Sequence, residues 1–93
     1  MEHHFEWDDE KARTNLKKHD IDFNEASTIF DDPLFITFLD EEHSIDEERY
    51  ITIGLSSKQG LLIVAHTERG NNIRIISARK AAKNEENFYA EAG

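Results

Sequence analysis

Apolar and polar side chains alternate along several stretches of the chain, a period of two that is typical of β-strands with one buried face. The pattern predicts four strands, over residues 34–39, 49–56, 61–68 and 73–76. The third is apolar on both faces over residues 61–65, so we expect it to lie in the centre of the sheet. Residue types that favour tight turns fill residues 57–60 and 69–72, which predicts that the last three strands form an antiparallel meander.

The charge order near the N-terminus predicts a first helix. Asp8 is a good N-cap residue, acids follow it, and Lys17 and Lys18 come at the far end. Negative charge at the start and positive charge at the end are what a helix dipole favours. We therefore expect a helix that begins at Asp8 and ends near His19 and Asp20.

A second helix follows after a short break. Asp22 and Glu25 have the spacing of a capping box, although the strict pattern starts with Ser or Thr. Pro33 ends this helix, because the residue before a proline avoids the helical region. A short strand over residues 4–6 precedes both helices.

The stretch over residues 73–80 has the pattern of a strand that runs directly into a helix. Ser77 is a natural N-cap, since its hydroxyl can accept a hydrogen bond from a free N–H of the first turn. Good helix formers follow it. We expect the last helix to span residues 78–90.

These elements define the expected fold class. It is α+β, with a small antiparallel sheet of about four strands that two helices precede and a C-terminal helix follows. At 93 residues the chain supports one domain, residues 1–93, with a single modest core.

Composition excludes several classes of protein. With 38% hydrophobic residues the chain is globular and not disordered, and without cysteine it has neither a disulfide framework nor a thiolate metal site. No apolar run approaches the roughly 20 residues of a membrane span. The acidic N-terminus is unlike a secretory signal. We expect a cytoplasmic protein that does not associate with membranes.

The formal net charge is −9, which argues against nonspecific binding to nucleic acids or membranes and favours a basic protein partner. Residues 40–48 contain six acids and one histidine. We expect a solvated loop there, with docking of a cationic partner as the alternative. Neither these acids nor the neighbouring His3 and His4 have the spacing of a metal site, so no metal or other cofactor is expected.

Residues 73–80 contain three cationic side chains, although the chain as a whole is acidic. Arg74, Arg79 and Lys80 fall within residues 73–80, which contain no acid. The predicted helix would put Arg79 in its first turn, where free N–H groups attract anions. Guanidinium groups bind two phosphate oxygens at once. The pattern therefore predicts a binding site for an anion such as phosphate.

At this point the chain resembles the BrnT toxins. The resemblance covers nearly the whole chain, and two motifs carry most of its specificity: Phe5-Glu6-Trp7-Asp8 and Arg74-Ile75-Ile76-Ser77-Ala78-Arg79. Further matching segments are Lys18-His19, Phe30-Asp31-Asp32-Pro33, Glu48-Arg49, Ile53-Gly54 and His66-Thr67-Glu68. At position 20 the chain has Asp where the family commonly has Gly.

The resemblance implies a RelE-like fold and a function. BrnT proteins are metal-independent ribonucleases that restrain translation, in type II toxin–antitoxin modules. Each is neutralised by a DNA-binding antitoxin, BrnA, and the operator DNA is contacted only through the antitoxin. The implied partners are thus RNA and a BrnA-type antitoxin, and a homodimer or a heterotetramer with the antitoxin stays open.

Metal-free RNA cleavage needs a base, an acid and cations that stabilise the charge on the phosphorane. We assign Arg74 and Arg79 to the phosphate, with His66 and Lys80 as further catalytic candidates. The alternatives are a cross-strand ion pair for Arg74, a surface ion pair for Arg79, solvation for Lys80 and a structural hydrogen bond for His66.

Four more residues are candidates for substrate binding: Arg49, Trp7, His19 and Tyr89. Each has a structural alternative that we consider the simpler one. Arg49 can pair with an acid of the preceding loop, Trp7 can pack on the sheet, His19 can cap a helix C-terminus, and Tyr89 can lie in the core. A catalytically silent module that binds an antitoxin-like basic partner is the second functional hypothesis, because of the acidic charge.

Overall fold

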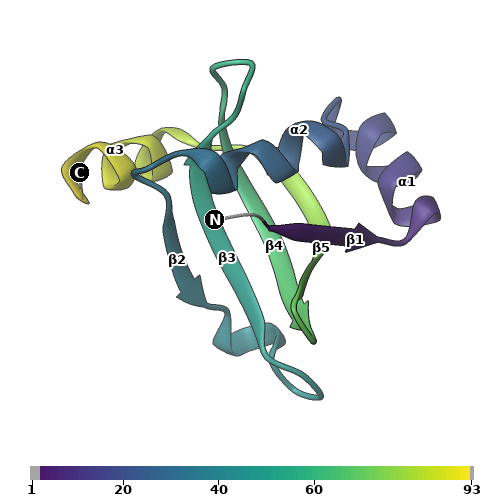
Figure 1. Ribbon diagram of the computed structural model, residues 1–93. Helices are drawn as coiled ribbons and strands as arrows, with labels where there is room; N and C mark the ends of the chain where they lie inside the picture. The colour runs from purple at the N-terminus through teal and green to yellow at the C-terminus, as the bar shows by residue number, and fades with distance from the viewer. Residues whose placement is uncertain (1–2, 93) are drawn as a thin grey trace.

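A five-stranded sheet organises the fold, with the strand order β1-β5-β4-β3-β2 (Figure 1). The computed structural model describes residues 3–92. The strands are β1 His4–Trp7, β2 Ile36–Leu39, β3 Arg49–Leu55, β4 Leu61–Arg69 and β5 Asn72–Lys80. The helices are α1 Asp9–His19, α2 Phe23–Ser27 and α3 Lys83–Ala92, with 3₁₀ turns η1 Thr28–Asp31 and η2 Glu41–His43. The α+β class that the sequence predicts is confirmed.

The antiparallel meander is confirmed for β3, β4 and β5, and β2 adds to it in antiparallel fashion. β4 lies at the centre, as its apolar character predicts. β1 is the exception, because it pairs in parallel with β5 from His4 opposite Asn72 to Trp7 opposite Ile75. The first strand and the last strand of the chain therefore lie side by side at one edge of the sheet.

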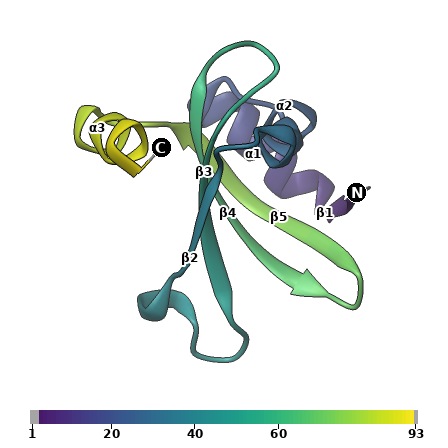
Figure 2. The ribbon, with the colours of Figure 1, turned by 60° about the vertical axis from the view of Figure 1, so that its left-hand side comes forward.

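The two faces of the sheet are covered unequally. Figure 2 shows α3 on the opposite side of the sheet from α1 and α2. The main core lies on the α1 and α2 side, and its members are Ile21, Phe23, Ala26, Ile29, Phe30, Leu62, Val64, Ile75 and Ala78. Gly54 on β3 permits this packing, because a Cβ there would lie 2.9 Å from the Cβ of Ile29. None of the helices within residues 3–92 is long and apolar enough to cross a membrane.

The register between β4 and β5 shifts once. Ile75 lies opposite His66, whereas Ser77 lies opposite Ala65. Ile76 is therefore an extra residue, as in a β-bulge, and it reverses the alternation of side chains along the rest of β5. Ile75 and Ala78, three residues apart, both reach the main core for this reason.

The predicted N-terminus of the last helix is wrong. β5 continues to Lys80 and α3 begins at Lys83, so Ser77 is a strand residue and not an N-cap. Pairing with β4 as far as Leu62 opposite Lys80 outweighs the helical preference of the residues after Ser77. Ala78 is held in the core, which a helix starting there would not allow.

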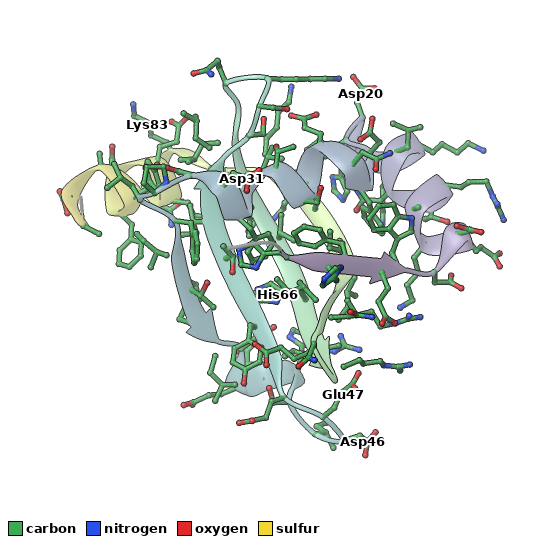
Figure 3. All side chains as sticks on the ribbon, in the orientation of Figure 1. Asp20, Asp31, Asp46, Glu47, His66 and Lys83 are labelled. Atoms are coloured by element: carbon green, nitrogen blue, oxygen red, sulfur yellow. The ribbon has the colours of Figure 1, made fainter. Side chains whose placement is uncertain are left out.

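The N-termini of the first two helices follow the predictions. The carboxylate of Asp8 accepts a hydrogen bond from the N–H of Lys11, and that of Asp22 from the N–H of Glu25. α1 ends at Asp20, which has a left-handed backbone with φ +58° and whose N–H donates to the carbonyl of Leu16. Asp20 lies at the C-terminal end of α1 in Figure 3.

Candidate functional site

Arg79 forms a bidentate ion pair with Glu85 of α3. Its Nη1 and Nη2 lie 2.7 and 2.8 Å from the two carboxylate oxygens of Glu85. This interaction, helped by the N–H of Ala82, lowers the pKa of Glu85 to about 2 and raises the pKa of Arg79. The Arg79 side chain remains 45% exposed. The surface ion pair foreseen as the alternative for Arg79 is present.

Arg74 is also paired. Its Nη1 lies 2.8 Å from Oε2 of Glu6, directly across the junction of β1 and β5. Asn72 donates to the other oxygen of the same carboxylate at 3.0 Å. The hydrogen bonds from Asn72 and Arg74 together hold the pKa of Glu6 below its usual value. The cross-strand ion pair foreseen for Arg74 is therefore present, on a parallel pair of strands.

The two arginines share a face of the sheet but do not form one clamp. Because of the bulge at Ile76, both point to the α3 side, Arg74 opposite Thr67 and Arg79 opposite Ile63. These two positions are four residues apart on β4, or about 13 Å along the strand. The expected anion site at a helix N-terminus is wrong, since Arg79 lies on a strand and each guanidinium already has a carboxylate partner.

The remaining cationic candidates lie far from one another. Lys80 is exposed at the end of β5, and its carbonyl accepts a hydrogen bond from Arg79 at 3.2 Å. Arg49 opens β3 and faces the acidic loop, where it lines a shallow cavity with Asp46 and Glu47. Among residues 3–92 the ion pair expected between Arg49 and these acids is not formed.

Two aromatic candidates have structural contacts. Trp7 packs edge-on against Phe23 with ring centroids 5.8 Å apart, so it has a packing role as in the simpler alternative, although this partner belongs to α2 and not to the sheet. The hydroxyl of Tyr89 donates to Oδ2 of Asp32, and burial with this hydrogen bond raises the pKa of Tyr89 to about 12. Burial alone would raise the pKa of Asp32, but hydrogen bonds from Tyr89 and two backbone N–H groups outweigh it and lower that pKa.

His66 lies near the middle of the sheet (Figure 3) and is only 4% exposed. Its Nε2 lies 2.7 Å from the hydroxyl of Thr52, so the structural hydrogen bond foreseen for it is present. Burial lowers the pKa of His66 to about 4, so its imidazole is neutral at pH 7. A neutral, enclosed imidazole is poorly placed to exchange protons with a bulky polymer.

A different group of cations gathers where α1 lies against the end of β5. Lys11, Thr14 and Lys18 are spaced i, i+3 and i+7, so they share one face of the helix. With His19 they line a cavity of about 240 Å³ that Ser77 closes on the strand side. Glu10 is the single carboxylate of this lining. We call Lys11, Thr14, Lys18, His19 and Ser77 the α1 cluster.

Asn15 fixes the position of the α1 cluster. This buried side chain donates to the carbonyl of Ala78 at 2.9 Å and accepts from the N–H of Ala78 at 3.0 Å. It also donates to the carbonyl of Ile21 at 3.0 Å. α1 is thereby tied to the strand edge that β1 leaves unpaired, next to Ser77.

The sequence interpretation identified only one member of the α1 cluster as a site residue. His19 is a predicted binding residue, whereas Lys11, Thr14, Lys18 and Ser77 are not among the predicted site residues. The helical spacing of Lys11, Thr14 and Lys18 was the available signal. Within residues 3–92, neither Lys11 nor Lys18 takes part in an ion pair, which leaves both ammonium groups available to an anion.

The described residues contain no group of three or more His, Cys, Asp or Glu side chains that could hold a metal ion. What the α1 cluster offers chemically is two ammonium groups, one imidazole and two hydroxyls around one hollow. Such a set can bind a phosphodiester and move a proton at the same place.

Comparisons with protein families and with solved structures both give matches. The sequence profile of a family described as the ribonuclease toxin BrnT of type II toxin–antitoxin systems matches residues 7–85. Among solved structures, the Brucella abortus ribonuclease toxin BrnT is similar in fold, with a TM-score of 0.67 and 22% sequence identity. That similarity covers 88% of this chain and 100% of the other. No curated protein matches.

Proposed function

This chain belongs to the BrnT family of ribonuclease toxins of type II toxin–antitoxin systems, and on that premise we propose that it cleaves RNA without a metal ion, restrains translation, and is neutralised by a BrnA-type antitoxin. One observation supports the catalytic part. The α1 cluster places around a hollow two lysines that have no ion-pair partner among residues 3–92, on a chain whose net charge is −9.

Each member of the α1 cluster has a role in this proposal. In metal-free cleavage the ribose 2′-hydroxyl loses its proton, its oxygen attacks the phosphorus, and the 5′-oxygen leaves with a proton. Lys11 and Lys18 stabilise the negative charge that gathers on the phosphorane. His19 accepts the proton of the 2′-hydroxyl, since imidazole is a side chain suited to proton transfer, and water gives a proton to the leaving 5′-oxygen. Thr14 and Ser77 donate hydrogen bonds to phosphate oxygens.

The arginines of β5 have a secondary place in the proposal. Arg79 is half exposed, and its guanidinium already binds two carboxylate oxygens of Glu85 with the geometry that a phosphate would use. A phosphate of bound RNA could therefore take the place of Glu85, at the cost of releasing α3. Arg74, half buried against Glu6, instead holds β1 in place.

The test is incubation of purified, antitoxin-free protein with RNA in excess EDTA. We expect cleavage by the wild type, and a decrease of about 100-fold for Lys11→Ala and for Lys18→Ala. Lys17→Ala is the matched control, because Lys17 is exposed on α1 but does not line the hollow. Intact RNA after incubation with folded wild-type protein would contradict the proposal, and so would equal losses for Lys17→Ala and Lys18→Ala.

A specific surface supports the antitoxin part of the proposal. On the α3 side of the sheet, Ile36, Phe38, Ile51 and Phe88 line an apolar groove of about 490 Å³, in which Phe38 and Phe88 are 45% and 50% exposed. The acidic loop below it carries Ile45, which is 88% exposed. Figure 3 shows Asp46 and Glu47 on this loop, at the end of the molecule away from the helices.

This surface suits a basic segment with apolar anchors, which is the chemistry expected of a DNA-binding antitoxin. It equally supports the second hypothesis, a silent module that binds such a partner. Expression in cells separates the two. Growth arrest that the Lys18→Ala variant no longer causes favours the ribonuclease, whereas tight binding to a basic partner without any arrest favours the silent module.

A further inference from the structure

A second hollow lies on the α1 and α2 side of the sheet, near the turn between β4 and β5. Its volume is about 380 Å³. It is lined by His3, Phe30, Phe35, Thr37, His66, Glu68, Gly70, Asn71, Asn72 and Ile73. No lysine or arginine is among them, whereas there is one carboxylate, that of Glu68. This chemistry disfavours an anion such as phosphate, which the carboxylate would repel.

One buried atom of the lining has no partner. The Nδ1 atom of His66 is enclosed and makes no hydrogen bond within residues 3–92. Its Nε2 is engaged by Thr52, whose hydroxyl lies 2.7 Å from that of Thr37. Thr52 can either donate to Nε2 or accept from it. In both cases the neutral imidazole keeps an unused hydrogen-bonding function on Nδ1, an acceptor if Nε2 has the proton and otherwise a donor. Buried polar groups without partners are rare and require an explanation, and a ligand in the adjoining hollow is one.

The walls of the hollow are aromatic. Phe30 lies at its centre, with ring centroids 5.1 Å from His66, 5.8 Å from Phe35 and 6.0 Å from His3. Phe35 is an exposed large side chain, so one aromatic wall is open to solvent. Aromatic walls of this kind stack on unpaired nucleobases, and a carboxylate at the rim can accept hydrogen bonds from a base amino group.

We propose that this hollow, the His66 pocket, binds one unpaired nucleobase of an RNA substrate, with the base against Phe30 and Phe35 and its exocyclic amino group on the carboxylate of Glu68. The assignment rests on the proposed ribonuclease function and gives it a base-selective subsite. Guanine, adenine and cytosine have the required amino group, whereas uracil does not. Asn71 also lines the hollow, and its side-chain amide offers a further donor and acceptor.

The test uses nucleosides, which carry no phosphate, added to the full-length protein. Guanosine, adenosine, cytidine and uridine are titrated while NMR records the imidazole signals of His66. We expect the three amino-bearing nucleosides to shift these signals and uridine to bind at least fivefold more weakly. Ribose 5-phosphate is the probe for an anion site, and it is expected to leave the signals unchanged.

Two variants at the rim keep the proposal falsifiable without disturbing buried His66. Glu68→Gln should weaken the binding of guanosine, adenosine and cytidine about tenfold, because a neutral amide oxygen accepts a weaker hydrogen bond than a carboxylate, and leave uridine unaffected. Phe35→Leu should weaken all four nucleosides, also about tenfold, because it removes the stacking surface. Glu47→Gln, in the exposed loop, is the control and should change nothing.

The outcomes separate this proposal from the proposed function. If no nucleoside shifts the signals of His66 in folded protein, or if ribose 5-phosphate shifts them equally, the His66 pocket is not a base site, even when RNA is cleaved. If nucleosides bind as expected but wild-type protein leaves RNA intact, base binding stands and the ribonuclease assignment fails.

Discussion

The side-chain amide of Asn15 pairs with the backbone of Ala78 as a neighbouring strand would, donating to its carbonyl and accepting from its N–H. β1 pairs with β5 only as far as Ile75, so the strand edge beyond would otherwise bury polar groups without partners. One side chain of α1 thus completes the sheet and positions the α1 cluster.

Asn15→Ala should lower the free energy of unfolding by about 3–5 kcal/mol, because it leaves three buried backbone groups without hydrogen bonds. Urea denaturation at pH 7 measures the change. Asn87→Ala, in exposed α3, is the control and should stay within about 0.5 kcal/mol of the wild type. A loss below about 1 kcal/mol for Asn15→Ala would mean that water replaces these hydrogen bonds.

Asp20→Gly should stabilise the protein. Asp20 has φ +58°, a left-handed conformation that costs an L-residue energy and that glycine adopts freely. We expect a gain of about 0.5–1 kcal/mol, reduced by the extra freedom of glycine in the unfolded chain. Asp20→Ala should destabilise, since alanine tolerates this conformation less well than aspartate. Thermal melts of the three proteins should give the order Gly, Asp, Ala, and equal values for Gly and Ala would refute this account of the helix end.

Stability should fall as the pH drops from 6.5 to about 4, because of His66. The unfolded chain binds a proton on this histidine near pH 6.5, whereas the folded protein binds it only near pH 4. Above pH 6.5 the effect is absent, and across the window it amounts to about 3 kcal/mol. Tyr50 stacks on His66, and His3 and Glu68 line the same hollow, so these three are titratable groups close to it on this side of the sheet.

Unfolding free energies at pH 7.5, 6 and 5 measure this dependence. His66→Gln should flatten the curve between pH 6.5 and 5, because glutamine has no titrating group. His43→Gln, in the exposed 3₁₀ turn, should leave the slope as it is. An unchanged slope in the His66 variant would assign the pH dependence to other groups.

Glu85→Gln should loosen α3. No residue of α3 is buried, and the helix is held by the Arg79–Glu85 pair and by the hydrogen bond from Tyr89 to Asp32. We expect faster amide hydrogen exchange throughout α3 and a loss of about 1 kcal/mol, since the pair is partly exposed. Glu86→Gln changes the same charge one residue away and should leave the exchange of α3 unaltered. Unchanged protection in Glu85→Gln would show that apolar contacts of Phe88 suffice.

The sequence predicted the elements whose signals are local. The caps at Asp8 and Asp22, the end of α1 at Asp20 and the order of the meander all follow from residue type and period. It failed at residues 77–80, where helix-forming residues continue a strand because β4 pairs with them. Whether these residues form a helix or a strand is decided by pairing with a strand that is distant in the sequence, and a local sequence pattern contains no information about that pairing.

The candidate site also depends on contacts between residues that are distant in the sequence. Arg74 and Arg79 were recognisable as cations, but their partners Glu6 and Glu85 come from other elements, so their neutralisation could not be read from residues 73–80. The bulge at Ile76, which sets the face that each arginine points to, has no sequence signal of its own. His66 was a candidate, yet its pocket depends on Phe30, Phe35 and Asn71 from three separate segments.

The parallel pairing of β1 with β5 also governs when the protein can finish folding. β1 is synthesised before the other strands of the described sheet, but β5, the strand with which it pairs, begins only at Asn72. A nascent or prematurely terminated chain that stops before β5 therefore keeps its first strand without a neighbour and leaves Asn15 without Ala78. The native sheet can form only after β5 has been made, so products that stop before it should be inert and open to proteolysis.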